Sequence, residues 1–243
     1  KELLAHPDQR VRQEAHFALP DRHAVSLLRD VALNGTNLFA RLHALWALGI
    51  AVRADRTAEG ALLAACEAKD DEVRAQAVRV LGDERRAGAA DMIVARLSDP
   101  SPRVRFFAAL AAGRIGIAEA LAPLRQLLID AGTNDPNLRH AAVMGLAGCA
   151  SVDELEHFAR DPERNVRMGA LLVQRRRGDP TIARFLLDED AGLVLEAARA
   201  IHDVPIAGAM ESLAMTRVDA ARLAAGESAL LRRVLDANYR LGR

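Results

Sequence analysis

Arginine recurs directly after an apolar residue at one position of a repeated pattern, and such a row could bind anions. The guanidinium is planar and presents five N–H donors in a fixed fork, which suits carboxylate and phosphate groups. The alternative role is structural, with each arginine bonding an aspartate or the free carbonyls of a helix end. We expect the structural role, because buried arginine is usually paired. This arginine ladder consists of Arg12, Arg41, Arg74, Arg105, Arg139, Arg167 and Arg232.

Histidine and cysteine could supply metal or haem ligands. The histidines closest to the repeated pattern are His16, His43, His140 and His202. Each belongs to a different copy of the pattern, and none forms a local His-x-x-x-His pair, so we expect ordinary hydrogen-bonded histidines. Cys66 and Cys149 lack the paired spacing of a zinc site or a haem attachment motif. Buried thiols are therefore expected, and no cofactor is predicted.

The sequence carries no recognisable catalytic motif. It has no Gly-rich phosphate loop, nucleophile elbow or clustered carboxylate pair, and we expect no enzyme activity from this segment. Basic and acidic residues number 33 each, so no nucleic-acid partner is expected. The one basic run, at 175–177, is typical of a solvated helix end. No uncharged apolar run approaches the roughly 18 residues of a membrane span, so no membrane insertion is expected.

A repeat defines the elements that position these residues. Apolar anchors recur 28 to 37 residues apart, at Val11, Ala40, Val73, Val104, Leu138, Val166, Val194 and Leu231. This period accommodates two helices. Alanine follows each of the first seven anchors by four residues, on the same helical face, where a small side chain lets helices approach closely. Turn signals such as Asp70-Asp71 and Asp99-Pro100 precede most anchors and would cap the next helix.

Each copy is predicted to hold a helix A before the turn and a helix B at the anchor. Helix A strings, for example 59–68 and 89–97, place apolar residues three and four apart. A single pair cannot bury its own apolar stripe, so the copies must stack. The predicted fold is all-α, a right-handed α-α superhelix of about eight two-helix repeats. We expect one solenoid over residues 1–243 that starts inside its first repeat, with irregular structure or an extra helical turn near residues 215–228.

Large apolar residues stand six positions after several anchors. They are Phe17, Trp46, Leu110, Met144 and Leu172. If this strip reaches the concave surface of the superhelix, it could dock a partner helix or a neighbouring domain, with Trp46 and Phe17 as anchors. The alternative is that these side chains pack between helices A and B, as most helical apolar stripes do.

The helix B strings, with their Asp-Pro turns, resemble HEAT repeats of the armadillo-like class over essentially the whole chain. Longer blocks, namely HPDQRVRQEAHFAL, ARLHALWALG, DPSPRVRFFAALAAGRIG, EAARAIHDVPI and RRVLDANYRLG, resemble the HEAT segment of planctomycete-type haem-binding proteins with a sorbosone-dehydrogenase-like propeller. That resemblance implies an exported multi-domain parent, for example a periplasmic one, in which a propeller precedes the segment and a cytochrome c domain often follows. The chain has no Cys-x-x-Cys-His motif, so no catalytic or haem residue is carried over.

The sequence therefore favours a non-catalytic protein-interaction or interdomain scaffold within a larger redox protein. Its expected partners are proteins or neighbouring domains of the same chain, the propeller and the cytochrome c domain. Two alternatives stay open. One is a HEAT-like enzyme of the DNA glycosylase or phycobilin lyase type that uses the concave surface. The other is a free-standing regulatory HEAT adaptor.

Overall fold

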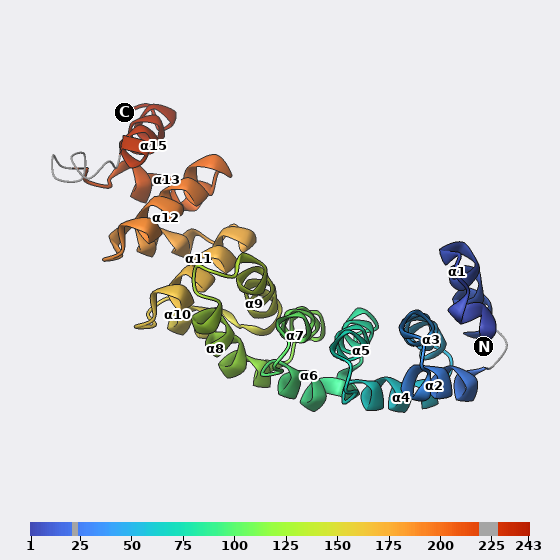
Figure 1. Ribbon diagram of the computed structural model, residues 1–243. Coiled ribbons are helices and arrows are strands. Elements are labelled where there is room, and N and C mark those ends of the chain that lie inside the picture. Colours follow the sequence, from blue (N-terminus) through green and yellow to red (C-terminus); the bar gives the residue numbers. More distant parts are fainter. Residues whose placement is uncertain (21–23, 219–227) are drawn as a thin grey trace. The chain divides into compact units, whose positions relative to one another are not determined.

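The chain is built from helices that stack in pairs. The computed structural model describes residues 1–20, 24–218 and 228–243, and every regular element in these ranges is a helix (Figure 1). The described chain divides into two compact units, unit 1 (Lys1–Ala150) and unit 2 (Ser151–Arg243). A single solenoid over the whole chain stays a prediction, and each unit is described by itself.

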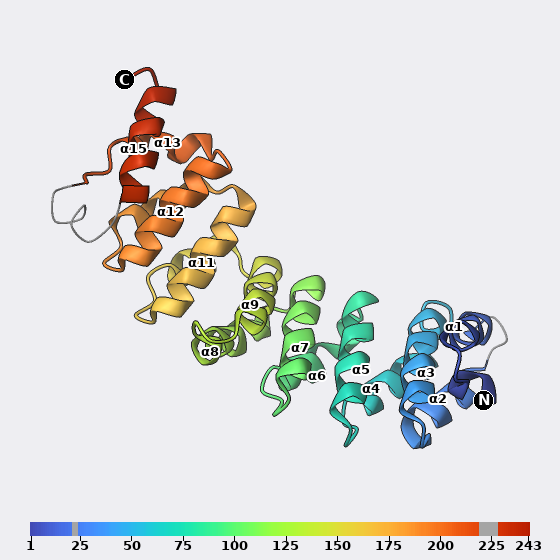
Figure 2. The same cartoon turned by 45° about the horizontal axis from the view of Figure 1, so that its top comes forward.

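Unit 1 consists of two rows of helices. Its elements are η1 (Glu2–Ala5), α1 (Gln9–Ala18), α2 (Val25–Asn34), α3 (Leu38–Ala51), α4 (Thr57–Ala65), α5 (Asp71–Asp83), η3 (Ala87–Ala89), α6 (Ala90–Arg96), α7 (Pro102–Ile115), η4 (Ala118–Ala120), α8 (Leu121–Ala131) and α9 (Pro136–Cys149). The B helices α3, α5, α7 and α9 lie side by side in chain order, with α1 against α3 (Figure 2). The A helices α2, α4, α6 and α8 form the second row.

Unit 2 continues the same alternation with shorter A elements. It contains α10 (Val152–Phe158), α11 (Arg164–Arg177), η5 (Pro180–Leu187), α12 (Ala191–Asp203), α13 (Ala207–Ala214) and α15 (Ser228–Arg240). The packed pairs are α10 with α11, η5 with α12, and α13 with α15. Each predicted anchor therefore lies on a B helix or at its start, and the predicted all-α repeat fold is confirmed. The irregular structure expected near residues 215–228 falls mostly outside the described residues.

Short polar side chains cap several B helices as the turn signals predict, but not all: α7 begins after Ser101 without a side-chain cap, and the predicted cap Asp99 accepts from Arg74 instead. The side chains of Asp8, Asn37, Asp70, Asp135 and Asp190 each accept a hydrogen bond from a backbone N–H in the first turn. These bonds satisfy donors that have no partner within the helix. The alanines four residues after the anchors are buried in every one of the seven copies. In the capped copies, capping and small-residue packing together fix the direction of the B helix.

Glycine allows the B helices of unit 1 to pack backbone against backbone. A Cβ placed on Gly148 of α9 would lie 1.9 Å from the carbonyl oxygen of Gly113 in α7. A Cβ on Gly82 of α5 would lie 2.5 Å from the Cβ of Ala111 in α7. No larger side chain fits at these distances without moving a helix, so the middle of the B row is held in close register.

The described helices are also too short or too polar to cross a membrane.

Candidate functional site

The side of the B row in unit 1 that faces away from the buried anchors carries most of the aromatic residues of the chain. Positions one before and two, three and six after an anchor lie about 200° to 300° around the helix from it, away from the buried anchor and alanine. Four of the six phenylalanines and the only tryptophan occupy these positions. With two aliphatic residues they form the inner aromatic face, which consists of Phe17, Phe39, Trp46, Phe106, Phe107, Leu110 and Met144.

The inner aromatic face is partly open to solvent. Phe17 and Phe39 are 51% and 58% exposed, whereas the other five side chains are half-buried. The predicted strip is therefore neither wholly surface nor wholly core. Its fifth member, Leu172 on α11, is half-buried in unit 2. The third copy has Arg79 at the strip position, and its guanidinium lies 5.7 Å from the centre of the Phe107 ring.

Hydrogen bonds across three helices hold the half-buried part of this face in place. The indole Nε1–H of Trp46 donates to Oε1 of Gln76, 3.1 Å away on α5, and the Gln76 amide donates to Glu72 at 2.8 Å. Glu72 is ion-paired with Arg103 of α7, whose guanidinium lies 5.3 Å from the centre of the Phe107 ring. Gln76 is buried, so each of these bonds replaces one that water cannot supply.

A histidine pair lies beneath the open end of the face, where α1 meets α3. The Nδ1 atoms of His16 and His43 are 2.9 Å apart, and both side chains are buried. The His16 ring packs 4.2 Å from the Phe17 ring, and the His43 ring lies 4.7 Å from the Trp46 ring, edge to face. The structure thus brings together two histidines that the sequence had placed in separate copies.

Arg12 of α1 determines which ring nitrogen of His43 carries the proton. Nε–H of Arg12 donates to Nε2 of His43 at 3.2 Å, so a neutral His43 carries its proton on Nδ1 and donates it to His16. Burial, with smaller contributions from the neighbouring His16 and Arg12, lowers the pKa of His43 to about 4. Burial also lowers the pKa of His16. Both rings are therefore uncharged at neutral pH.

Four members of the arginine ladder use one end of the guanidinium in the same way. In each, Nη1 donates to the carbonyl oxygens five and six residues earlier, where the preceding turn ends. These four are Arg12, Arg74, Arg105 and Arg167. The contacts tie the start of each B helix to the turn that precedes it, which is what a structural role requires.

The partners of the remaining guanidinium nitrogens, Nε and Nη2, differ among these four arginines. Arg74 donates through Nε and Nη2 to Asp99 at 3.0 and 2.9 Å, and Arg167 donates likewise to Asp188 at 2.9 and 3.1 Å. The ion pair holds the pKa of Asp99 below its usual range despite burial. Nε of Arg105 is buried and has no hydrogen-bond partner in the part of the chain that the structure describes.

The remaining ladder members do not share this geometry. Nε of Arg41 donates to the carbonyl oxygen of Ala32 at 3.0 Å. Arg139 is half-buried on α9, and Arg232 is exposed on α15. The next residue, Arg233, forms the ion pair with Asp203 instead. We call the contact of the ladder arginine with the preceding turn the clasp. The sequence pattern therefore identifies the position of the clasp but not the copies in which it forms.

Two groups outside the inner aromatic face contain residue types that are often catalytic or metal-binding. The rim of a cavity of about 430 Å³ in unit 2 holds His202 between Asp203 and Asp236, at 2.8 and 2.6 Å, together with three arginines of α15. Cys66 is buried, and burial raises the pKa of its thiol to about 12, which leaves it protonated and unreactive at neutral pH. Within the described ranges, no group of three or more potential ligands is arranged to hold a metal ion.

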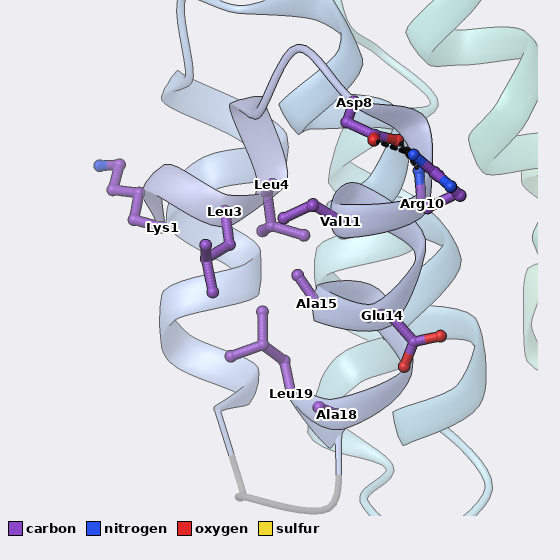
Figure 3. Close-up of a pocket in the computed structure, with 10 residues that line it drawn as sticks. All are labelled: Lys1, Leu3, Leu4, Asp8, Arg10, Val11, Glu14, Ala15, Ala18 and Leu19. Atoms are coloured by element: carbon purple, nitrogen blue, oxygen red, sulfur yellow. Dashed lines mark hydrogen bonds and ion pairs between the residues drawn. The ribbon is translucent and has the colours of Figure 1, made fainter.

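An apolar groove of about 620 Å³ lies between η1 and α1 (Figure 3). Leu3, Leu4 and Val11 are among the side chains that line it, and the ion pair of Asp8 with Arg10 stands at its rim. Its lining includes no histidine or cysteine. The groove is lined mainly by apolar side chains, its charged members are Lys1, Asp8, Arg10 and Glu14, and it shares no lining residue with the inner aromatic face.

Sequence reasoning missed Phe39, Phe106, Phe107 and Gln76. It considered only the position six residues after the anchor. Helical geometry places the residue one before the anchor, and the residues two and three after it, on the same side of the helix as that position. Counting all four positions would have identified them.

Comparison with known proteins supports HEAT repeats in unit 1. Residues 58–133 match the family model of HEAT repeats. No curated protein matches the chain in sequence. The matched range covers α4 to α8, and the helix pairs before and after it repeat the same arrangement.

Solved structures share the fold at low sequence identity. The complex of CpcE and CpcF of phycocyanin lyase from Nostoc matches with a TM-score of 0.51 and 20% identity, over 88% of this chain and 91% of that one. The YibA protein of E. coli matches with 0.53 and 19%, over 95% and 90%. Human deoxyhypusine hydroxylase in complex with glycerol matches with 0.41 and 19%, over 90% and 96%.

These findings correct one expectation and leave another without support. The expectation that the segment is no enzyme is wrong as an inference from missing motifs, because a phycocyanin lyase complex has this fold. A fold of this kind therefore occurs in an enzyme complex, so the absence of familiar motifs does not exclude activity. Nothing among the matches connects the chain to haem-binding dehydrogenases of the planctomycete type.

Proposed function

We propose that unit 1 binds a protein partner through the inner aromatic face. The observation that carries this proposal is the concentration of aromatic residues there in a chain that is only 3% aromatic. Two phenylalanines of this face remain more than half exposed, and exposed aromatic side chains beside arginine are typical of binding hot spots.

The composition of the face indicates what kind of surface it would bind. The half-buried centre is apolar, and its rim carries arginines that are already paired, Arg103 with Glu72 and Arg114 with Asp83. Because the rim charges largely cancel, binding would depend on apolar contact more than on net charge. The fitting partner presents a row of apolar side chains, such as one face of an amphipathic helix or a domain surface.

For the partner itself, we propose first a neighbouring domain of a longer chain. The resemblance of several sequence blocks to the HEAT segment of haem-binding, dehydrogenase-like proteins favours a propeller or a cytochrome c domain in this role. A free-standing adaptor that binds a separate protein is the alternative. The arrangement of the face is the same in either case.

The test is a calorimetric titration of the segment with the propeller and cytochrome c portions of its own gene product. The double variant Phe17→Ala with Phe39→Ala should weaken binding at least tenfold, because each removes an exposed anchor. Its thermal stability should stay close to that of the parent, since neither side chain is buried.

The matched control is Val152→Ala with Tyr239→Ala, which removes two exposed apolar side chains from unit 2. This control should bind as the parent does. Equal binding by the parent and the Phe17 and Phe39 double variant would overturn the proposal.

A further inference from the structure

The hydrogen bonds around the histidine pair all donate in one direction along the chain of groups, and one added proton would break one of them. Arg12 donates to Nε2 of His43, and His43 donates through Nδ1 to His16. A proton on His43 would go to Nε2, where it would face the N–H of Arg12. A proton on His16 would go to Nδ1, where it would face the N–H of His43. Either event replaces a hydrogen bond with two opposed donors.

The charged groups around the pair make protonation more costly. On α1, Arg12 lies 3.2 Å from His43. On the α5 side stands Glu72, which is ion-paired with Arg103 and reaches the cluster only through Gln76 and Trp46. On α3 itself Arg41 bonds the Ala32 carbonyl, and on the helices packed against α3, Asp30 of α2 pairs with Lys1 and Glu59 of α4 pairs with Arg86. His6, before α1, accepts a bond from the N–H of Asp8. No carboxylate among these bonds either ring to stabilise a cation.

The helix that this pair holds lies at the end of the B row. α1 packs against η1 and α3, whereas α5 and α7 each lie between two other B helices. Among the described B helices, α1 contacts only α3, so the bonds between these two helices contribute directly to holding α1 on the row.

We propose that the His16–His43 pair is an acid-sensitive latch that holds α1 on α3. Acidification releases the latch and withdraws Phe17 from the inner aromatic face. The consequence for partner binding rests on the proposed function, but the latch itself does not. A metal site is the weaker use of the pair, because the bond from Arg12 occupies the second nitrogen of His43 with a donor, where metal-bound histidine normally donates.

Trp46 offers a direct readout, since it is the only tryptophan and its ring lies 4.7 Å from His43. Its fluorescence should change in one step as the pH falls, with a midpoint between pH 4 and 6.5. His43→Gln keeps an acceptor for Arg12 and a donor for His16 but cannot titrate, so it should abolish the step. His16→Gln should shift or abolish it.

Two controls separate this step from other titrations. His140→Gln changes an exposed histidine on α9 and should leave the step intact. Glu72→Gln removes the carboxylate that is linked to Trp46 and should also leave it intact. A step that persists unchanged in His43→Gln, or its absence from the parent protein, would overturn the latch.

Release of α1 is measured by amide hydrogen exchange, with each rate divided by the chemical rate at that pH. Protection of residues 9–18 should fall at least tenfold between pH 7.5 and 5, while that of residues 102–115 should change less than twofold. His43→Gln should remove the difference. If the exchange result holds but no partner binds at pH 7.5, the proposed function fails and the latch stands. If the partner binds but the protection of residues 9–18 does not fall, the latch fails and the proposed function stands.

Discussion

The two units use the same repeat to build helix pairs but place their aromatic residues differently. In unit 1 the phenylalanines at the open end of the B row are more than half exposed. In unit 2 both phenylalanines, Phe158 and Phe185, are buried on A elements, and the positions six residues after the last two anchors hold the buried alanines Ala200 and Ala237.

This difference distinguishes the positions that the repeat needs for stacking from the positions whose side chains can vary. The anchor, the alanine four residues later and the clasping arginine are needed to stack helices, and they recur in both units. The positions on the side of the B helices that faces away from the anchors are not needed for stacking, so they can differ from copy to copy. Function is therefore expected where these free positions depart from the common pattern.

The largest effect should come from the close backbone contact within unit 1. Gly148→Ala places a Cβ against the backbone of Gly113, and we expect a loss of about 3 kcal/mol in the free energy of unfolding, measured by urea denaturation. Gly60→Ala is the matched control, because a Cβ at this exposed helical position meets nothing within 4 Å. It should gain about 0.5 kcal/mol. Equal effects of the two would mean that α7 and α9 are not in register.

The next effect tests whether both units rely on the same clasp. Arg74→Met in unit 1 and Arg167→Met in unit 2 each leave a largely buried aspartate without its partner. Both should lose about 3 kcal/mol in chemical denaturation. Arg103→Met breaks an exposed pair and should lose less than about 1 kcal/mol. A large loss in only one unit would show that the shared pattern does not reflect a shared structural need.

Acid should separate the two units. The pKa of His43 is lower in the fold, about 4, than in the unfolded chain, about 6.5, so the unfolded chain takes up the proton first. Stability should therefore fall as the pH drops from about 6.5 to 4, by ~2 kcal/mol. In unit 2, bonds from Arg233 and His202 lower the pKa of Asp203 to about 2, so its contribution is lost only as the pH falls from about 3.8 to 2.

The measurement is urea denaturation at several pH values, followed by exchange at amides of each unit. His43→Gln should remove the loss between pH 6.5 and 4. Unit 2 losing protection before unit 1 would contradict this assignment.

The smallest expected effect is a gain in stability. Thr133 lies five residues before Leu138, as Asp99 lies five residues before Val104, so Thr133 holds the position from which an aspartate could pair with Arg105. Thr133→Asp should add about 1 kcal/mol of stability by supplying a partner to the buried Nε of Arg105. Thr133→Asn should gain less, and Thr133→Asp should gain nothing in an Arg105→Met background.

The parts of the structure that depend on local pattern could be predicted from the sequence. The anchors and their alanines predicted the B helices, and the turn aspartates predicted caps such as Asp70 and Asp135, because helical period and capping act within a few residues. The histidine pair could not be predicted in this way. His16 lies five residues after its anchor and His43 lies three after its own, so their contact depends on how α1 packs on α3.

Oxidative footprinting with and without the bound partner tests whether the inner aromatic face is the docking surface, because hydroxyl radicals label exposed aromatic and methionine side chains. We expect the partner to protect Phe17 and Phe39 of unit 1. Tyr239 and Met215 of unit 2, which are 80% and 70% exposed, should be labelled equally in both states. Protection of Tyr239 and Met215, with Phe17 and Phe39 labelled as before, would contradict this expectation.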